Sequence, residues 1–196
     1  MCGRYSNHVK EMHNWSSVLG NWPAGHGMSD NVAPSQFAPV VVMYQGEIIT
    51  LPMRWGLVPA WSKTPKPKYA TFNARIETIA QKPAFRDSFS KRQTCLVPSN
   101  GYYEWTGEKG NKQPYFIERK DKQPLMMAGI WEFWQQQDQQ LYSFTILTKA
   151  ANDTLAELHP RMPVLLKKEE ALTWQTQYMN LDAVVGPEMQ YWPKVS

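Results

Sequence analysis

The chain has 196 residues and a formal net charge of +4, which predicts one domain with a substantial core. It contains no run of eighteen apolar residues and does not open with a basic segment followed by an apolar one, so we expect neither a membrane span nor a secretory signal. Its two cysteines, Cys2 and Cys95, are too few for a disulfide framework, and this favours a reducing, cytoplasmic setting.

The histidines give no sign of a metal site. None of them is spaced from a cysteine as in a zinc motif; they are His8, His13, His26 and His159. We therefore predict no metal and no other cofactor, and we expect the protein to act as a monomer.

Positive charge is concentrated in residues 54–92. This segment holds nine lysines and arginines against two acidic residues, a net charge of +7, whereas the rest of the chain sums to −3. It also contains Trp55, Trp61, Tyr69 and Phe72. Cations that meet phosphates and rings that stack on bases are typical of a single-stranded nucleic-acid groove, although a run of charge often forms an ordinary solvated face. From this segment we select Trp61 and Arg86 as candidate DNA contacts.

The first part of the chain predicts a helix, a loop and a hairpin. Apolar residues at three- and four-residue steps indicate an amphipathic helix over 6–20, capped by Ser6. Residues 21–38 are rich in Pro, Gly, Asn and Ser and predict an irregular loop. Extended segments over 40–44 and 48–51, separated by Gln45-Gly46, predict a hairpin, and a further extended segment covers 53–59.

A basic loop over 62–68 follows, in which Pro65 and Pro67 exclude a helix or a central strand. Pro83 then predicts the start of a short helix over 83–91. The later predicted elements are strands over 94–97, 102–106, 115–118, 125–134 and 141–148, a helix from Asn152 or Asp153 to Leu158, a strand over 164–166 and a helix over 168–176. With no repeat and no regular alternation of strands and helices, the pattern predicts an α+β fold with a mainly antiparallel, curled or barrel-like sheet and peripheral helices.

Cys2 has unusual chemistry if Met1 is removed. The terminal amine and the thiol then lie on adjacent carbons, with ordinary pKa values of about 7.7–8.0 and about 8.5. An aldehyde can form an imine with this amine, and the thiol can close a thiazolidine ring. Taken alone, position 2 favours a frayed terminus instead, because chain ends are often disordered.

Three further polar residues stand in apolar or aromatic surroundings. Asn73 alternates with Phe72 and Ala74, as on an ordinary half-exposed strand. Glu104 is surrounded by aromatic residues, and burial there would suit it to proton transfer, although structural glutamates are common. His159 follows a predicted helix in a Pro-flanked turn, where it can exchange protons near neutrality or simply stabilise the helix end.

Seven ordered blocks together resemble the SRAP family, the SOS response-associated peptidases or abasic site processing proteins. The blocks are Cys2-Gly3-Arg4-Tyr5, Asn31-Val32-Ala33-Pro34, Arg54-Trp55-Gly56-Leu57-Val58-Pro59, Asn73-Ala74-Arg75-Ile76-Glu77-Thr78, Cys95-Leu96-Val97-Pro98, Gly101-Tyr102-Tyr103-Glu104-Trp105 and His159-Pro160-Arg161-Met162-Pro163. They span nearly the whole chain, so the resemblance predicts a single SRAP-like domain over 1–196.

The resemblance implies that the protein senses and shields abasic sites in single-stranded DNA through a stable thiazolidine cross-link. It implies Cys2 as the nucleophile, with Asn73, Glu104 and His159 as further catalytic positions. Arg4, Arg75 and Arg161 are implied as phosphate contacts. In a bacterium, such a protein is expected in the cytoplasm at the nucleoid.

Two alternatives remain open from the sequence. The family name suggests a cysteine peptidase that uses Cys2, His159 and Glu104, with removal of Met1 by the protein itself. The other alternative is a non-covalent binder of single-stranded DNA, for which Cys2 has no role.

Overall fold

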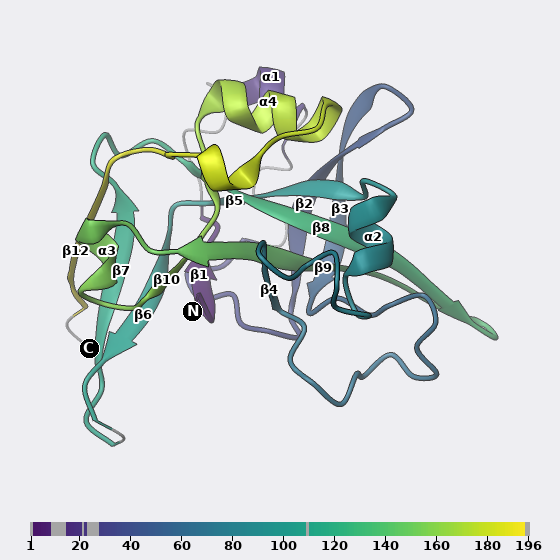
Figure 1. Cartoon of the computed structure of the whole chain (residues 1–196), viewed down its shortest axis with the longest axis horizontal. Helices are drawn as coiled ribbons and strands as arrows, with labels where there is room; N and C mark the ends of the chain where they lie inside the picture. Colours follow the sequence, from purple (N-terminus) through teal and green to yellow (C-terminus); the bar gives the residue numbers. More distant parts are fainter. Residues whose placement is uncertain (1, 9–14, 21, 23–27, 109, 195–196) are drawn as a thin grey trace.

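The computed structural model describes residues 2–8, 15–20, 22, 28–108 and 110–194. It confirms an α+β fold with a mainly antiparallel, barrel-like sheet (Figure 1). The strands in this part of the chain are β1 (Arg4–Ser6), β2 (Phe37–Tyr44), β3 (Glu47–Trp55), β4 (Asn73–Arg75), β5 (Thr94–Ser99), β6 (Gly101–Thr106), β7 (Gln113–Arg119), β8 (Leu125–Gln136), β9 (Gln139–Ala150), β10 (Arg161–Pro163), β11 (Leu165–Leu166) and β12 (Met189–Pro193). The helices are α1 (Ser16–Leu19), α2 (Arg86–Ser90), α3 (Asp153–Ala156), α4 (Lys168–Thr176) and the 3₁₀ helix η2 (Leu181–Ala183).

Five strands close into a barrel. The pairings run β9-β3-β2-β5-β8, and β8 pairs again with β9. The β3–β9 and β4–β9 contacts are parallel, and the other pairings in this sheet are antiparallel. A separate sheet has the order β1-β6-β7-β12 and lies to the left of the barrel in Figure 1.

Both faces of the barrel wall are buried, because strand residues alternate between two apolar clusters. Val41 belongs to a cluster with α1 and α4, including Leu19 and Trp174, which cover one side of the barrel. Val40 and Val42 belong to the other cluster, which joins the barrel to the four-stranded sheet. Cys2 lies in this second cluster, so the N-terminal segment is part of the core.

The predicted hairpin is confirmed, with β2 paired to β3 from Phe37↔Arg54 to Tyr44↔Glu47. Its turn has positive φ at both Gln45 and Gly46, 51° and 83°, as a two-residue type I′ turn requires. The expected extended segment over 53–59 is partly right, since Met53–Trp55 continue β3 and residues 56–59 are irregular.

The four-stranded sheet places the aromatic block of the sequence. A Cβ on Gly101 would lie 2.4 Å from the Ile117 carbonyl oxygen and 2.5 Å from the Phe116 ring, so only glycine permits this close pairing of β6 with β7. Along β6, Tyr102 and Glu104 then share the buried face, while Tyr103 and Trp105 are half-buried on the other.

The predicted helix over 6–20 is wrong at its start. Ser6 ends β1 and pairs with Gly101, so pairing with a distant strand overrides its capping preference. Helix α1 covers Ser16–Leu19; Val9 and Met12 lie outside the described residues. The helix expected over 83–91 is shorter, and the loop expected over 21–38 ends earlier, at the start of β2.

Candidate functional site

Cys2 is fully buried, so the frayed terminus that position 2 favours when taken alone is not what the structure shows. Two connections hold the segment that follows it. Arg4 pairs with Tyr103 of β6, and Tyr5 exchanges backbone hydrogen bonds with Val32, 3.2 and 2.8 Å long. The terminus is therefore an edge strand docked against the core, with Cys2 held in a fixed place.

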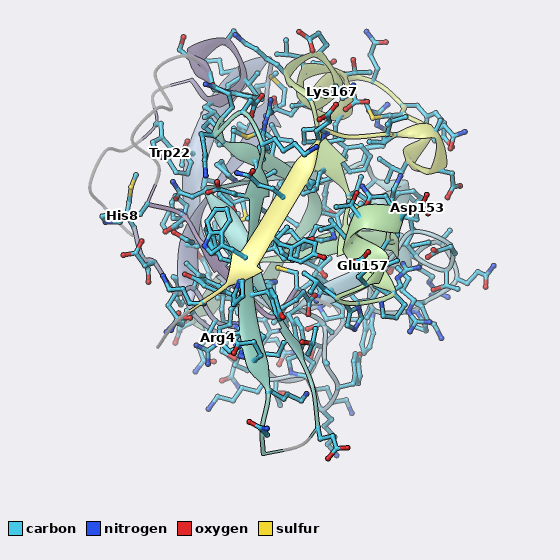
Figure 2. The ribbon with its side chains drawn as sticks, turned by 90° about the vertical axis from the view of Figure 1, so that its left-hand side faces the viewer. Arg4, His8, Trp22, Asp153, Glu157 and Lys167 are labelled. Carbon is cyan, nitrogen blue, oxygen red and sulfur yellow. The ribbon has the colours of Figure 1, made fainter. Side chains whose placement is uncertain are left out.

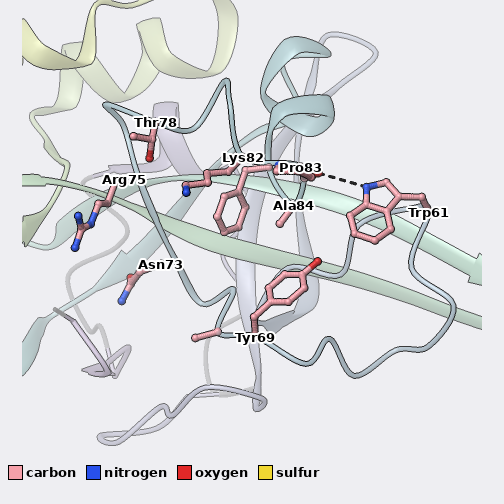
Figure 3. A pocket seen from close by; sticks show the side chains of 10 residues that line it. Trp61, Tyr69, Asn73, Arg75, Thr78, Lys82, Pro83 and Ala84 are labelled. Atoms are coloured by element: carbon pink, nitrogen blue, oxygen red, sulfur yellow. Dashed lines mark hydrogen bonds between the residues drawn. The ribbon is translucent and has the colours of Figure 1, made fainter.

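Asn73 anchors Cys2 from the opposite side. Its side-chain amide donates a 2.7 Å hydrogen bond to the Cys2 carbonyl oxygen. Asn73 begins β4, and the parallel pairing of this strand with β9 fixes its backbone. As the sequence predicted, Ala74 is buried, while Asn73 and Arg75 lie on the other face of the strand and line a pocket (Figure 3).

Glu104 is only 5% exposed and lies near enough to Cys2 for its charge to act on the thiol. It is not on an edge strand, because β6 lies between β1 and β7. Burial raises the pKa of the Cys2 thiol far above its ordinary value, and the negative charge of Glu104 raises that pKa further. The thiol is therefore held protonated at neutral pH, with a carboxylate near it.

Two tyrosines that the sequence did not indicate complete the surroundings of Cys2. Tyr5 and Tyr102 are fully or almost fully buried. Burial raises the pKa of each phenol, and the nearby Cys2 raises it further. No local pattern marks them, since aromatic residues in strands usually belong to the core.

His159 is held by the turn that follows α3. Its Nδ1 lies 2.9 Å from the backbone nitrogen of Arg161, from which it can accept, and 3.2 Å from the carbonyl oxygen of Arg161, to which it can donate. Both neutral tautomers of the ring therefore find a partner on the Arg161 backbone. Asn152 caps α3 by accepting a 3.0 Å bond from the Leu155 backbone N–H, as predicted.

Arg161 is paired within the protein. Its guanidinium donates to both carboxylate oxygens of Glu77, at 2.5 and 2.9 Å, and to the Thr148 carbonyl oxygen at 2.6 Å. The hydrogen bond from Arg161 lowers the pKa of the Glu77 carboxyl. This pair ties the turn of His159 to the segment that carries Asn73, and the phosphate contact expected of Arg161 stays a prediction.

A pocket of about 700 Å³ opens beside Asn73 (Figure 3). Its lining includes Trp61, Tyr69, Asn73, Arg75, Thr78, Lys82, Pro83 and Ala84. Trp61 and Tyr69 are 52% and 50% exposed, and the Trp61 indole donates a 3.3 Å bond to the Pro83 carbonyl oxygen. The pocket combines exposed rings with cations, and no carboxylate lines it.

The other expected DNA contacts lie outside this lining. Arg4 donates a 2.8 Å bond to Asn31, and the exposed Arg86 pairs with Asp87 at 3.0 Å. Tyr69 and Lys82 line the pocket but were not selected from the sequence, although both lie in the basic segment over 54–92.

On the side of the molecule that faces the viewer in Figure 2, a hydrogen bond joins the end of α3 to the four-stranded sheet. Figure 2 shows Arg4 near the lower end of β12 and, to the right of this strand, α3 with Asp153, followed by Glu157. The Tyr191 hydroxyl of β12 donates a 2.5 Å bond to Glu157, which fixes α3 against this sheet. The turn of His159 is thereby held at both ends.

Neither a metal-binding cluster nor a membrane-spanning helix occurs among the described residues. No group of three or more His, Cys, Asp or Glu side chains in this part of the chain is placed to hold a metal ion. None of its helices is long and apolar enough to span a membrane.

The fold is shared with solved structures. A protein from Bordetella bronchiseptica superposes with a TM-score of 0.85 at 23% identity, with all of both chains covered. A protein from Bacteroides thetaiotaomicron has a TM-score of 0.75 at 26% identity, covering 98% of this chain and 91% of the other.

Sequence comparisons identify relatives and a family. Abasic site processing protein YoqW of Bacillus subtilis is 34% identical over 182 residues, which cover 89% of this chain and 80% of YoqW. Abasic site processing protein HMCES of Xenopus tropicalis is 31% identical over 186 residues, covering 78% of this chain and 56% of HMCES. The sequence model of SOS response associated peptidase (SRAP) matches residues 1–189. The chain therefore belongs to the SRAP family.

Proposed function

We propose that this protein captures abasic sites in single-stranded DNA as a thiazolidine on Cys2, after Met1 has been removed. The observation that carries this proposal is the placement of Cys2: it is buried, its carbonyl is held by Asn73, and its thiol lies close to Glu104. The names of the relatives support DNA with abasic sites as the substrate.

The reaction balances without a cofactor or a metal. The Cys2 amine adds to the open-chain aldehyde of the abasic sugar and loses water to give an imine. The thiol then adds to the imine carbon, its proton passes to the nitrogen, and the ring closes. The DNA phosphodiester bonds need not break, so the lesion stays attached and covered.

Each polar residue has a proposed part in these steps. Asn73 orients Cys2 through the 2.7 Å bond to its carbonyl oxygen. Glu104 takes and returns the protons of imine formation and of thiol addition, a suitable task for a carboxylate beside a protonated thiol. His159, whose ring is held by the Arg161 backbone, donates a proton to the sugar oxygen and favours the open aldehyde.

The pocket beside Asn73 supports a single strand as the substrate. Its exposed rings, Trp61 and Tyr69, can stack on bases that have no pairing partner, and Arg75 and Lys82 can neutralise phosphates. In this proposal the monomer is sufficient, since every residue invoked comes from one chain.

A cysteine peptidase is less well supported. Such enzymes attack with a thiolate, usually one of low pKa, whereas burial raises the pKa of the Cys2 thiol.

The test is incubation with abasic single-stranded DNA, followed by a denaturing gel. We expect a slow-migrating band for the wild type and for Cys95→Ala, which removes the other buried cysteine, but no stable band for Cys2→Ser. A variant that keeps Met1 blocks the amine and should also lack the band. The same stable band from Cys2→Ser would overturn the proposal.

A further inference from the structure

A second, smaller pocket of about 280 Å³ adjoins the first. Tyr69 and Ala70 line both pockets, so this pair of residues forms a shared wall. The lining of the second pocket also includes Arg54 of β3 and Lys66 of the loop over 62–68, and none of the described residues that line it is a carboxylate.

Arg54 is a half-buried cation without a counter-ion. Its Nη2 reaches the Gly56 carbonyl oxygen at a long 3.4 Å, and its Nε is buried without a hydrogen-bond partner. Within the described part of the chain it forms no ion pair. Burial lowers the pKa of the Arg54 guanidinium, because the charge is partly removed from water and no nearby anion among the described residues offsets the loss of hydration. An anion in the pocket would relieve this cost.

Lys66 is held at the opening of the same pocket. The Ser62 hydroxyl donates a 2.7 Å bond to the Thr64 carbonyl oxygen, and the Thr64 hydroxyl donates a 3.1 Å bond to the Lys66 carbonyl oxygen. Pro65 and Pro67 restrict the backbone on either side. The loop therefore fixes the backbone of Lys66, an exposed residue that lines the same pocket as Arg54.

We propose that this pocket binds a backbone phosphate of the same DNA strand, next to the nucleotide held in the first pocket. A guanidinium and an ammonium group with no competing carboxylate suit a phosphodiester, and Tyr69 in the shared wall separates the two nucleotides. The inference rests on the proposed function and extends it, since neither Arg54 nor Lys66 is used in the chemistry at Cys2.

The test measures equilibrium binding of single strands that contain a reduced abasic analogue, which has no aldehyde and cannot cross-link. Arg54→Gln should weaken binding about 5- to 10-fold at low salt and reduce the slope of log affinity against log salt by about 0.7. Arg92→Gln, an exposed arginine outside both pockets, is the matched control and should change affinity less than about twofold. Thermal unfolding of both variants checks that they fold.

Lys66→Gln provides an independent test in an exposed loop, with Lys63→Gln as its control. It should also reduce the salt slope, whereas Lys63→Gln should not. The proposed phosphate lies on one side of the lesion. Shortening the DNA strand on that side should abolish the effects of Arg54→Gln and Lys66→Gln on binding, whereas shortening it on the other side should leave these effects unchanged.

Two results would overturn the inference. One is an equal loss of DNA affinity in the variants and in their controls. The other is tight, Arg54-dependent binding of inorganic phosphate alone, which would assign the pocket to a free anion. If the inference about this pocket fails, the wild type still forms the cross-linked band on the denaturing gel; if the chemistry at Cys2 fails, that band is missing, but the binding differences for the reduced analogue persist. A failure of this pocket is thus distinguishable from a failure of the chemistry at Cys2.

Discussion

The carboxylate of Glu104 affects Cys2 through its position on the buried face of β6, between two paired strands. Sequence indicated Glu104 by its aromatic neighbours and Cys2 by its place in the chain, but their proximity depends on β1 pairing with β6, a three-residue contact with no local signature. The resemblance to the SRAP family, rather than the periodicity of the sequence, therefore predicted that Cys2 and Glu104 belong to one site.

Replacing Glu104 tests its part in proton transfer. Glu104→Gln keeps the shape and removes the base, so we expect cross-linking at saturating DNA to slow at least about 100-fold with unchanged non-covalent affinity. Single-turnover gels measure the rate. Glu132→Gln is the matched control, since Glu132 is also a buried carboxylate but lies on β8 of the barrel, where it accepts a hydrogen bond from Ser88 of α2. The cross-linking rate of this variant should stay near that of the wild type. Equal rates for Glu104→Gln and the wild type would remove Glu104 from the mechanism.

Among the elements, those with strong local signals were predicted best. Helix α4 has the predicted bounds, and the Gln45-Gly46 turn fixed the hairpin. The short strands β1, β10 and β12 were missed, because segments of three to five residues take their conformation from the strands they pair with.

The link between β10 and the segment after β4 gives a prediction about acid. Arg161 lowers the pKa of Glu77, so the native carboxylate binds fewer protons than the unfolded one, and its stabilisation is present above about pH 4.5 and lost below it. Because Glu77 is 43% exposed, we expect Glu77→Gln to cost at most about 1 kcal/mol at pH 7.

Urea unfolding of the wild type and Glu77→Gln at pH 6 and pH 3.5 measures this difference. It should shrink at the lower pH. Glu188→Gln breaks a far more exposed pair with Lys120 and should show no such change. A difference for Glu77→Gln that is independent of pH would contradict the pair.

For the whole molecule, the core that joins the barrel to the four-stranded sheet holds both cysteines. Burial raises the pKa of each thiol above its ordinary value of about 8.5. Above that pH the unfolded chain loses these protons and the native state keeps them, so stability falls as pH rises. Each thiol contributes a slope of up to about 1.4 kcal/mol per pH unit.

Cys95→Ala should therefore flatten the decline of the unfolding free energy between pH 9 and 11. The comparison uses the slopes, because the lost side-chain volume lowers stability equally at every pH. The same slope in both proteins would show that Cys95 ionises as readily in the native state as in the unfolded chain.

The intact mass of the adduct tests capture at Cys2 most directly. A mass equal to the protein without Met1 plus the abasic strand minus one water, with Cys2 as the modified residue after digestion, is the result that we predict. An adduct that retains Met1, or one attached at another residue, would contradict the thiazolidine.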